Sequence, residues 1–152
     1  HGRTAGARAR RARVITALDT NVLLDVFLAD RRHGSTSQAA LREAYDAGGL
    51  VACEVVWAEV ATFFPTTEAA EDAMGRLGVR FIPMDRTDAM EAARRWSRFR
   101  AGAREEPRRM APDFLIGAHA LNHADRLLTR DRGFYRLAFQ GLSVVAPSGK
   151  GG

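Results

Sequence analysis

The sequence has little of several residue types, and each shortage narrows what the protein can be. Cys53 is the only cysteine, which excludes a disulfide within the chain and fits a reducing environment. No apolar run approaches the ~20 residues that a membrane span requires. The basic start of the chain is followed by no apolar secretory segment, so export is not expected. We therefore expect a cytoplasmic protein with no membrane partner.

Lysine is almost absent, and this excludes several phosphate enzymes. The only lysine, Lys150, lies in the C-terminal tail, too late to serve a site. Haloacid-dehalogenase-like phosphatases and receiver domains both need a lysine near an aspartate. The phosphatases also need a second aspartate two residues after the first, where this chain has Asn21. No glycine-rich loop ends in Lys-Ser or Lys-Thr, which excludes the common nucleotide hydrolases.

Positive charge exceeds negative charge, and nearly all of it is arginine. The formal net charge is +5 and the isoelectric point is near 10.5. Such a balance favours a polyanionic partner, either a nucleic acid or an acidic protein. Arginine binds phosphate and carboxylate through two parallel hydrogen bonds, whereas lysine acts as a point charge. A general bias towards Ala and Arg would explain the same excess.

The chain of 152 residues is most simply one α/β domain. We expect a flexible basic arm over 1–13, a domain over 14–147 and a flexible tail over 148–152. The apolar and helical patterns alternate along the domain, which predicts a parallel sheet between helices. The predicted strands are 14–18, 50–52, 79–83, 127–129 and 142–145. Four helices are predicted over 22–29, 54–64, 87–103 and 112–123. Another helix is predicted to open with a capping box of Ser35 and Gln38 and to end at Gly48-Gly49. A sixth is predicted after Pro65, with Thr66 or Thr67 as its N-cap.

Four acids occupy positions where a solvated carboxylate is not expected. Asp19 and Asp131 each follow a predicted strand, so both should emerge at the carboxyl edge of the sheet, where open α/β folds bind ligands. Glu59 and Asp113 each share the apolar face of a predicted helix. Buried carboxylates are costly unless they are paired or bind a metal. These acids therefore suggest a site for a divalent cation.

Each acid also has a simpler explanation. Asp19 could cap the helix that follows it, and Asp113 could interact with the dipole at a helix N-terminus. Asp131 could be a turn residue, and Glu59 could extend from a helix edge into water. Two acids after strands and two on apolar helix faces are harder to explain by capping alone.

Four stretches of the chain, in this order and spacing, resemble the PIN domains, and among them the VapC-type toxins of bacterial toxin–antitoxin pairs. The resemblance extends from Val14 to Val145. The matching stretches are Leu18–Leu24, Val55–Ala61, Pro112–Ala120 and Leu128–Phe134.

The resemblance implies a PIN-like three-layer α/β/α fold with a four- to five-stranded parallel sheet. It also implies a metal-dependent endoribonuclease that leaves a 5′-phosphate and a 3′-hydroxyl, a cognate VapB-type antitoxin and a homodimer. By the family pattern the residues that hold the metal and act in catalysis are Asp19, Glu59, Asp113 and Asp131. Thr129 would support them through its hydroxyl, and Thr20 and Asn21 would shape the floor of the site. Many members carry a further acid where this chain has Gly133, so Asp131 stands alone there.

The residue types suit this chemistry. Carboxylates are hard oxygen ligands for Mg²⁺ or Mn²⁺, and a metal-bound water is a better nucleophile near neutral pH. Four neighbouring acids repel one another, so without metal at least one should have a raised pKa. Arg108 and Arg109 could guide the RNA backbone, or could simply lie in a solvated loop. The two rival functions are a structure-specific DNA nuclease and a PIN-like RNA-binding module with little catalysis.

Several other residues could bind a metal, a base or a partner, but their positions favour a purely structural role. His119 and His123 have a spacing seen in zinc sites, but no third ligand is placed beside them, which favours a surface pair. Trp57, Trp96 and Phe99 could stack on bases, although their spacing favours packing. Phe63-Phe64 could belong to a partner surface, with burial in the core the expected alternative.

Overall fold

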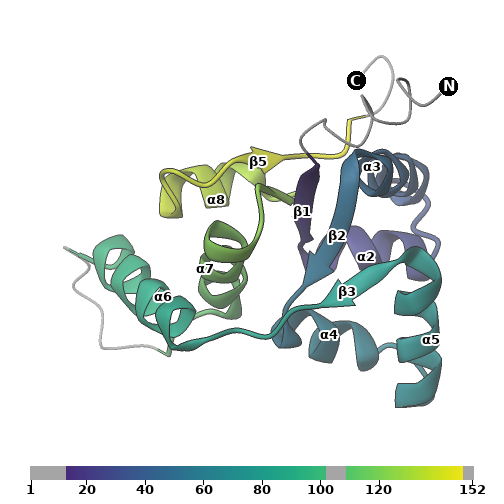
Figure 1. Ribbon diagram of the computed structural model, residues 1–152, viewed down its shortest axis with the longest axis horizontal. Coiled ribbons are helices and arrows are strands. Elements are labelled where there is room, and N and C mark those ends of the chain that lie inside the picture. The colour runs from purple at the N-terminus through teal and green to yellow at the C-terminus, as the bar shows by residue number, and fades with distance from the viewer. Residues whose placement is uncertain (1–12, 102–108, 149–152) are drawn as a thin grey trace, which may run out of the picture.

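A computed structural model of the protein describes residues 13–101 and 109–148. The predicted arm apart from Arg13, the loop 102–108 with Arg108, and residues 149–152 lie outside the described residues. A five-stranded sheet crosses the domain, with every described pair of strands parallel (Figure 1). In spatial order the strands are β3 (Val79–Phe81), β2 (Gly48–Ala52), β1 (Val14–Leu18), β4 (Arg126–Leu128) and β5 (Val144–Val145).

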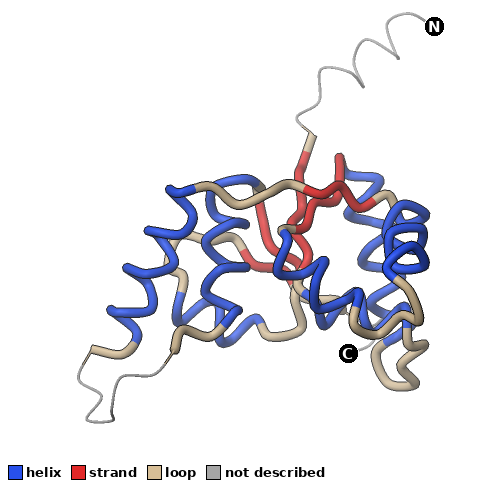
Figure 2. The backbone as a smooth tube through the Cα atoms, turned by 90° about the horizontal axis from the view of Figure 1, so that it is seen from below, coloured by secondary structure: helices blue, strands red, loops and turns tan. Residues whose placement is uncertain are grey.

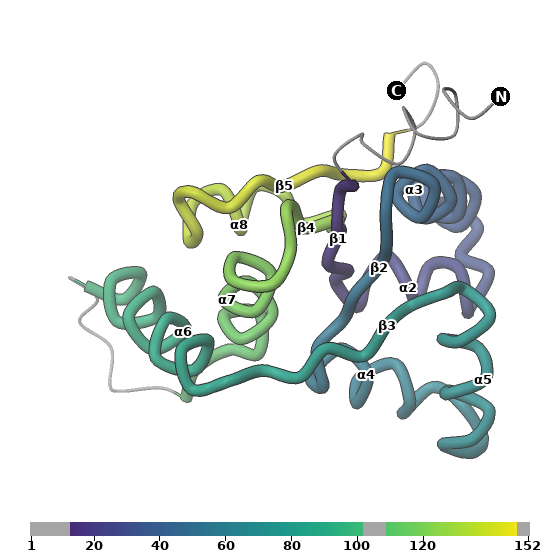
Figure 3. Tube along the Cα trace, in the orientation of Figure 1, coloured from purple at the N-terminus to yellow at the C-terminus, as the bar shows by residue number. Residues whose placement is uncertain are grey.

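The winding direction reverses between β1 and β4. The chain runs outward from β1 through β2 to β3, and Figure 3 shows how it then crosses back to β4. Leu18 and Leu128 are partners at the carboxyl ends of these two neighbouring strands. The predicted convergence of the Asp19 and Asp131 segments at one edge of the sheet is therefore confirmed.

Helices cover both faces of the sheet, as the three-layer prediction requires. In Figure 2 the strands lie between two groups of helices, with α2, α3 and α5 on one side and α6, α7 and α8 on the other, as labelled in Figure 1. Helix α4 contacts α2, α5 and α7. The helices are α2 (Thr20–Phe27), α3 (Gly34–Ala47), α4 (Glu54–Ala61), α5 (Thr67–Leu77), α6 (Arg86–Phe99), α7 (Pro112–His123) and α8 (Arg132–Ala138).

The predicted capping box at Ser35–Gln38 is wrong. Helix α3 begins at Gly34 with His33 as its N-cap, and this N-cap makes no side-chain capping bond. The preceding turn is fixed instead by Asp30, whose carboxylate accepts hydrogen bonds from the backbone N–H groups of Arg32 and His33 at 3.1 and 2.7 Å. A turn closed before Ser35 leaves that residue inside the helix. The capping box that does form, at Asp85 and Asp88 of α6, was not predicted.

Helix α8 was also missed, because it is short and has Gly133 in its first turn. Its burial compensates for this weak propensity, since Tyr135 and Phe139 are fully buried. Phe139 approaches α7 very closely at Gly117, where a Cβ atom would lie 2.5 Å from the Phe139 ring. A glycine at this position therefore lets the end of α8 pack on α7.

Trp57 and Trp96 are half-buried and pack as expected, whereas Phe99 makes ring contacts but is 44% exposed. Trp96 and Phe99 meet the buried Phe114 ring edge-on at 5.1 and 5.4 Å. Trp57 lies against Phe81 at 5.5 Å. The expectation that Phe63 is buried in the core is wrong, because Phe63 lies two residues after the end of α4 and is 54% exposed. None of the helices in the described ranges combines the length and apolarity that crossing a membrane would take.

Candidate active site

Asp19 sits at the end of β1, where it is bonded to both neighbouring elements. One carboxylate oxygen, Oδ1, accepts a 2.8 Å hydrogen bond from the Thr20 backbone N–H and so caps α2. The other, Oδ2, accepts a 2.8 Å bond from the Thr129 hydroxyl, just beyond β4. Capping and a role in the site are thus compatible, because the two oxygens face different donors.

Thr129 and Asn21 organise the floor beneath Asp19. The Thr129 hydroxyl accepts a hydrogen bond from the Asp131 backbone N–H at 2.9 Å while it donates to Asp19. The Asn21 carbonyl oxygen accepts from the Arg130 backbone N–H at 3.2 Å. Its amide nitrogen lies 3.4 Å from the Thr129 hydroxyl. Hydrogen bonds therefore connect the start of α2 to the segment that follows β4.

Two further acids reach the same edge of the sheet from helices. Glu59 is half-buried on α4 and accepts a 2.6 Å hydrogen bond from the Thr20 hydroxyl. Asp113 is half-buried in the first turn of α7. Asp131 is exposed at the N-cap of α8, where its side chain makes no capping bond. We refer to Asp19, Glu59, Asp113 and Asp131 as the acid cluster.

The charges of the acid cluster act on one another. Burial and then the negative charges of Asp19, Glu59 and Asp131 raise the pKa of Asp113 to about 6. An acid whose only role was to face a helix dipole would have a lowered pKa, so this explanation does not account for Asp113. Burial also raises the pKa of Asp19, although the hydrogen bonds from Thr129 and Thr20 oppose the rise. The expectation that at least one of the four acids has a raised pKa is therefore met at Asp113 and Asp19.

The acid cluster is electrostatically coupled but not tightly contracted. Among the described residues, the only three metal-ligating side chains that bring atoms within 4.8 Å of one another are Asp85, Asp88 and His123. A set of spaced carboxylates suits Mg²⁺, which usually keeps several waters and is held by one or two carboxylates directly. The donor set of the acid cluster therefore fits a hard divalent cation.

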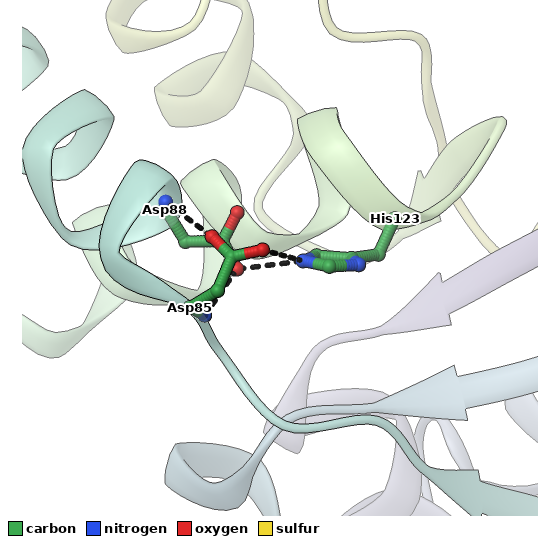
Figure 4. A group of neighbouring side chains, drawn as sticks. All are labelled: Asp85, Asp88 and His123. Carbon is green, nitrogen blue, oxygen red and sulfur yellow. Dashed lines mark hydrogen bonds and ion pairs between the residues drawn. The ribbon is translucent and has the colours of Figure 1, made fainter.

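The compact group of Asp85, Asp88 and His123 joins α6 to α7 (Figure 4), with His123 in the last turn of α7 and Asp113 in its first. Asp88 is fully buried, and its carboxylate accepts hydrogen bonds from the Asp85 backbone, the Asn122 amide and His123 at 2.9, 2.8 and 2.7 Å. Burial would raise the pKa of Asp88, but these bonds outweigh it and lower the pKa. Because its oxygens are already bonded, this group is explained as a tie between two helices.

The predicted surface pair of histidines is wrong for His119, which is 1% exposed. Its Nε2 bonds the Ile82 carbonyl at 2.8 Å, and its ring stacks on His123 at 4.7 Å. Burial lowers the pKa of His119, which favours the neutral ring. The histidines thus hold α7 to its neighbours.

Sequence reasoning missed an ion pair beside the site, between the buried Asp25 and the partly exposed Arg130. Arg130 donates from Nε and Nη2 to the two carboxylate oxygens of Asp25 at 2.8 and 3.1 Å. Ser37 of α3 also donates to Asp25 at 2.7 Å. The one available indication was the position of Asp25 on the buried face of α2, next to Val22 in the helical repeat. Of the two predicted RNA-guiding arginines, Arg109 is exposed and Arg108 lies outside the described residues.

The comparison with known families agrees with this geometry. A sequence model of the PIN domain matches residues 16–140, most of the chain and the segments that carry the acid cluster. The chain belongs to the PIN domain family. No curated protein sequence matches this PIN domain.

Solved structures share the fold of this PIN domain. VapBC2 from Rickettsia felis bound to a promoter DNA fragment matches with a TM-score of 0.66 and 16% identity, covering 88% of this chain and 99% of that chain. A toxin–antitoxin complex from Klebsiella pneumoniae matches with a TM-score of 0.61 and 23% identity, covering 88% and 98%. VapBC-1 from nontypeable Haemophilus influenzae matches with a TM-score of 0.62 and 18% identity, covering 87% of this chain and 97% of that chain. At these identities the matches establish the fold.

Proposed function

We propose that this PIN domain is a divalent-metal-dependent endoribonuclease and the toxin of a VapBC-type toxin–antitoxin pair. The observation that carries the proposal is the crowding of four carboxylates, which together with burial raises the pKa of Asp113 to about 6. Such crowding is unfavourable in a protein without a compensating cation. Strongly perturbed acids in one place are also typical of catalytic sites.

The acid cluster would hold Mg²⁺ or Mn²⁺. When bound, the cation would lower the pKa of a coordinated water and offset the charge that develops on the scissile phosphate. Around it, Thr129 fixes the rotamer of Asp19 and Thr20 fixes that of Glu59. Orientation by such outer hydrogen bonds is a large part of how a protein tunes a metal site.

RNA is the proposed substrate. The net charge of +5 favours a nucleic acid, and Arg109, with Arg108 beside it in the sequence, lies just before α7 and Asp113. We propose that these two arginines contact the RNA backbone, which would make binding dependent on salt. We propose that cleavage of the RNA phosphodiester leaves a 5′-phosphate on one product and a 3′-hydroxyl on the other.

Cleavage assays on matched RNA and DNA strands test this function. We expect RNA cleavage with Mg²⁺ or Mn²⁺ and none with a chelator. Asp19→Asn should lower the rate by more than about 100-fold, because loss of an outer partner alone costs 10- to 100-fold. Asp46→Asn, on the exposed face of α3, is the matched control and should keep the wild-type rate.

The rivals give different results in the same assay. Preferential cleavage of DNA would favour a structure-specific DNA nuclease. RNA binding without cleavage under any metal condition would favour a binding module. Equal cleavage by the wild-type protein and Asp19→Asn would refute the metal nuclease mechanism.

The proposed partner is a VapB-type antitoxin, and the proposed assembly is a homodimer. Support comes from the solved structures with this fold, which are toxin–antitoxin complexes. Co-expression with the product of the adjacent gene should yield a stable complex that no longer cleaves RNA, with the mass of each species measured by light scattering. A monomer in solution, or a neighbour that does not bind, would contradict this part. The proposed location is the cytoplasm, where the proposed RNA target would be found.

A further inference from the structure

Four arginines surround an exposed tyrosine at the edge of the sheet where β1, β2 and β3 begin. Figure 1 shows the starts of β1 and β2 at the top of the view, with α3 beside them. Asp19 follows the opposite end of β1, and the five residues of that strand span roughly 16 Å at about 3.3 Å per residue. We refer to Arg13, Arg42, Tyr45, Arg76 and Arg80 as the arginine groove.

The arginine groove consists of two hollows that share a wall. One hollow, of about 400 Å³, lies between α3 and α5 and is lined by Arg42 and Arg76. The other, of about 490 Å³, lies at the starts of β1 and β2 and is lined by Arg13 and Arg80. Tyr45 lines both hollows. None of the described residues that line them is an acid, so both hollows present positive charge.

Tyr45 is held in place but left uncovered. Its ring lies so close to Gly78 that a Cβ atom at that residue would be 2.5 Å from it. Gly78 ends α5 with a φ of 78°, a left-handed conformation that favours glycine. The Tyr45 side is nonetheless 54% exposed. A fixed, exposed aromatic ring between two positively charged hollows suits stacking on a nucleic-acid base.

A plainer role explains only two of the four arginines. Arg13 donates a hydrogen bond to a backbone carbonyl of β2 at 2.9 Å, and Arg76 pairs with Asp72 in the exposed last turns of α5 at 3.0 Å. Arg42 and Arg80 are exposed, and their side chains make no hydrogen bond or ion pair with any described residue. A general bias towards arginine would scatter such side chains over the surface, whereas these two line hollows on either side of one ring.

We propose that the arginine groove binds a stretch of single-stranded RNA away from the proposed cleavage site. The arginines would bind phosphates through paired hydrogen bonds, and a base would stack on Tyr45. An acidic protein segment would match the charge, but its carboxylates would leave the exposed ring unused. The choice of RNA over DNA rests on the proposed function. The arginine groove would hold a long RNA at a second point and would add affinity without taking part in the chemistry.

The test is the affinity of the full chain for a labelled oligouridine, measured by fluorescence anisotropy with a chelator present so that the RNA stays intact. The variant Arg42→Gln/Arg80→Gln removes the two unpaired charges. Each phosphate contact with a single strand contributes about 0.7 to the slope of log K against log salt, so the slope should fall by about 1.4. At about 0.1 M salt this corresponds to a loss of affinity of roughly 25-fold.

Tyr45 tests the stacking separately from the charge. Tyr45→Ala should weaken RNA binding by about fivefold or more and leave the salt slope unchanged, because no phosphate contact is lost. Tyr45→Phe keeps the ring and should keep the wild-type affinity.

Arg94→Gln/Arg98→Gln is the matched control, because it removes the same charge from exposed positions on α6, on the other side of the sheet. Its affinity and salt slope should stay close to those of the wild type. Equal losses in the two double variants would show an effect of net charge alone and would overturn the inference.

Three further outcomes would also decide the matter. Loss of binding in Arg42→Gln/Arg80→Gln with no effect of Tyr45→Ala, together with competition by polyglutamate, would assign the arginine groove to an acidic protein and overturn the inference. Tighter binding of a matched DNA strand would overturn the assignment to RNA. RNA cleavage by a wild-type protein whose groove variants bind RNA normally would refute this inference alone. Groove-dependent RNA binding by a protein that never cleaves RNA would support the inference and refute the proposed function.

Discussion

Asp113 lies half-buried at the start of α7 among three other carboxylates, and its pKa of about 6 reflects that crowding. Its charge works against the folded state whenever no cation is bound. A pKa raised from 3.8 to about 6 corresponds to at most roughly 3 kcal/mol. Solvent around a half-buried group reduces the effective value. In the proposed active site, stability of the metal-free protein would thus be exchanged for function.

Replacing Asp113 by asparagine should therefore stabilise the metal-free protein and inactivate it. We expect the free energy of unfolding at neutral pH, measured by urea titration with chelator, to rise by about 1–2 kcal/mol. RNA cleavage with Mg²⁺ should be lost. A less stable Asp113→Asn protein would show that the carboxylate is satisfied within the fold, and that its crowding is not a cost to the metal-free protein.

The same residue predicts a pH dependence. In the unfolded chain Asp113 titrates near 3.8, and in the folded protein near 6. Between these values the folded state binds the proton more tightly, so this contribution to stability is present at low pH and is lost as the pH rises through about 6. The stability advantage of metal-free Asp113→Asn over wild type should grow between about pH 5 and about pH 7.5. Urea midpoints at both values check this, and a constant difference would contradict it.

At the scale of elements, the segment after β4 is held in place by α2. It carries Thr129 and Asp131, and it is fixed through the ion pair of Arg130 with Asp25. The Asp25 side chain is 5% exposed and the Arg130 side chain 36%. Removal of Asp25 leaves the Ser37 hydroxyl and the Arg130 guanidinium without this partner, and water can reach the guanidinium only in part.

We expect Asp25→Ala to lower the free energy of unfolding by about 2–4 kcal/mol. Amide hydrogen exchange should quicken at Thr129 and Asp131, because their anchor to α2 is lost. Asp72→Ala is the control, since Asp72 and Arg76 form an exposed pair on α5 and its loss should cost less than about 1 kcal/mol. Equal effects of the two substitutions would argue against an anchoring role for Asp25.

At the scale of the whole molecule, the parallel sheet brings distant segments into one site. Asp19 and Thr129 are 110 residues apart in the chain and hydrogen-bonded in space. Acids delivered by β1, α4, α7 and the end of β4 meet only in the folded protein. A cation held by them would bind the folded state and not the unfolded chain, and would stabilise the fold by mass action.

Mg²⁺ should therefore raise the thermal unfolding midpoint of the wild-type protein. At a concentration about 100 times its Kd, the added stability is about 2.7 kcal/mol. The measurement compares MgCl₂ with NaCl at equal ionic strength, so that general screening is removed. Asp113→Asn should gain much less, and an equal gain in both proteins would mean that the cation binds elsewhere.

The sequence by itself determined the parallel α/β fold, the four acids and the strand ends that carry two of them. These follow from local patterns, because an apolar run that ends in an acid already specifies a buried strand and the edge where its side chain emerges. It did not determine α8, the Asp25–Arg130 pair, the Asp88–His123 tie or the arginine groove. Those depend on which elements pack together, and that is set by strand order and by close contacts such as Gly117 with Phe139. Local periodicity says which face of an element is buried, but only the tertiary structure decides what that face meets.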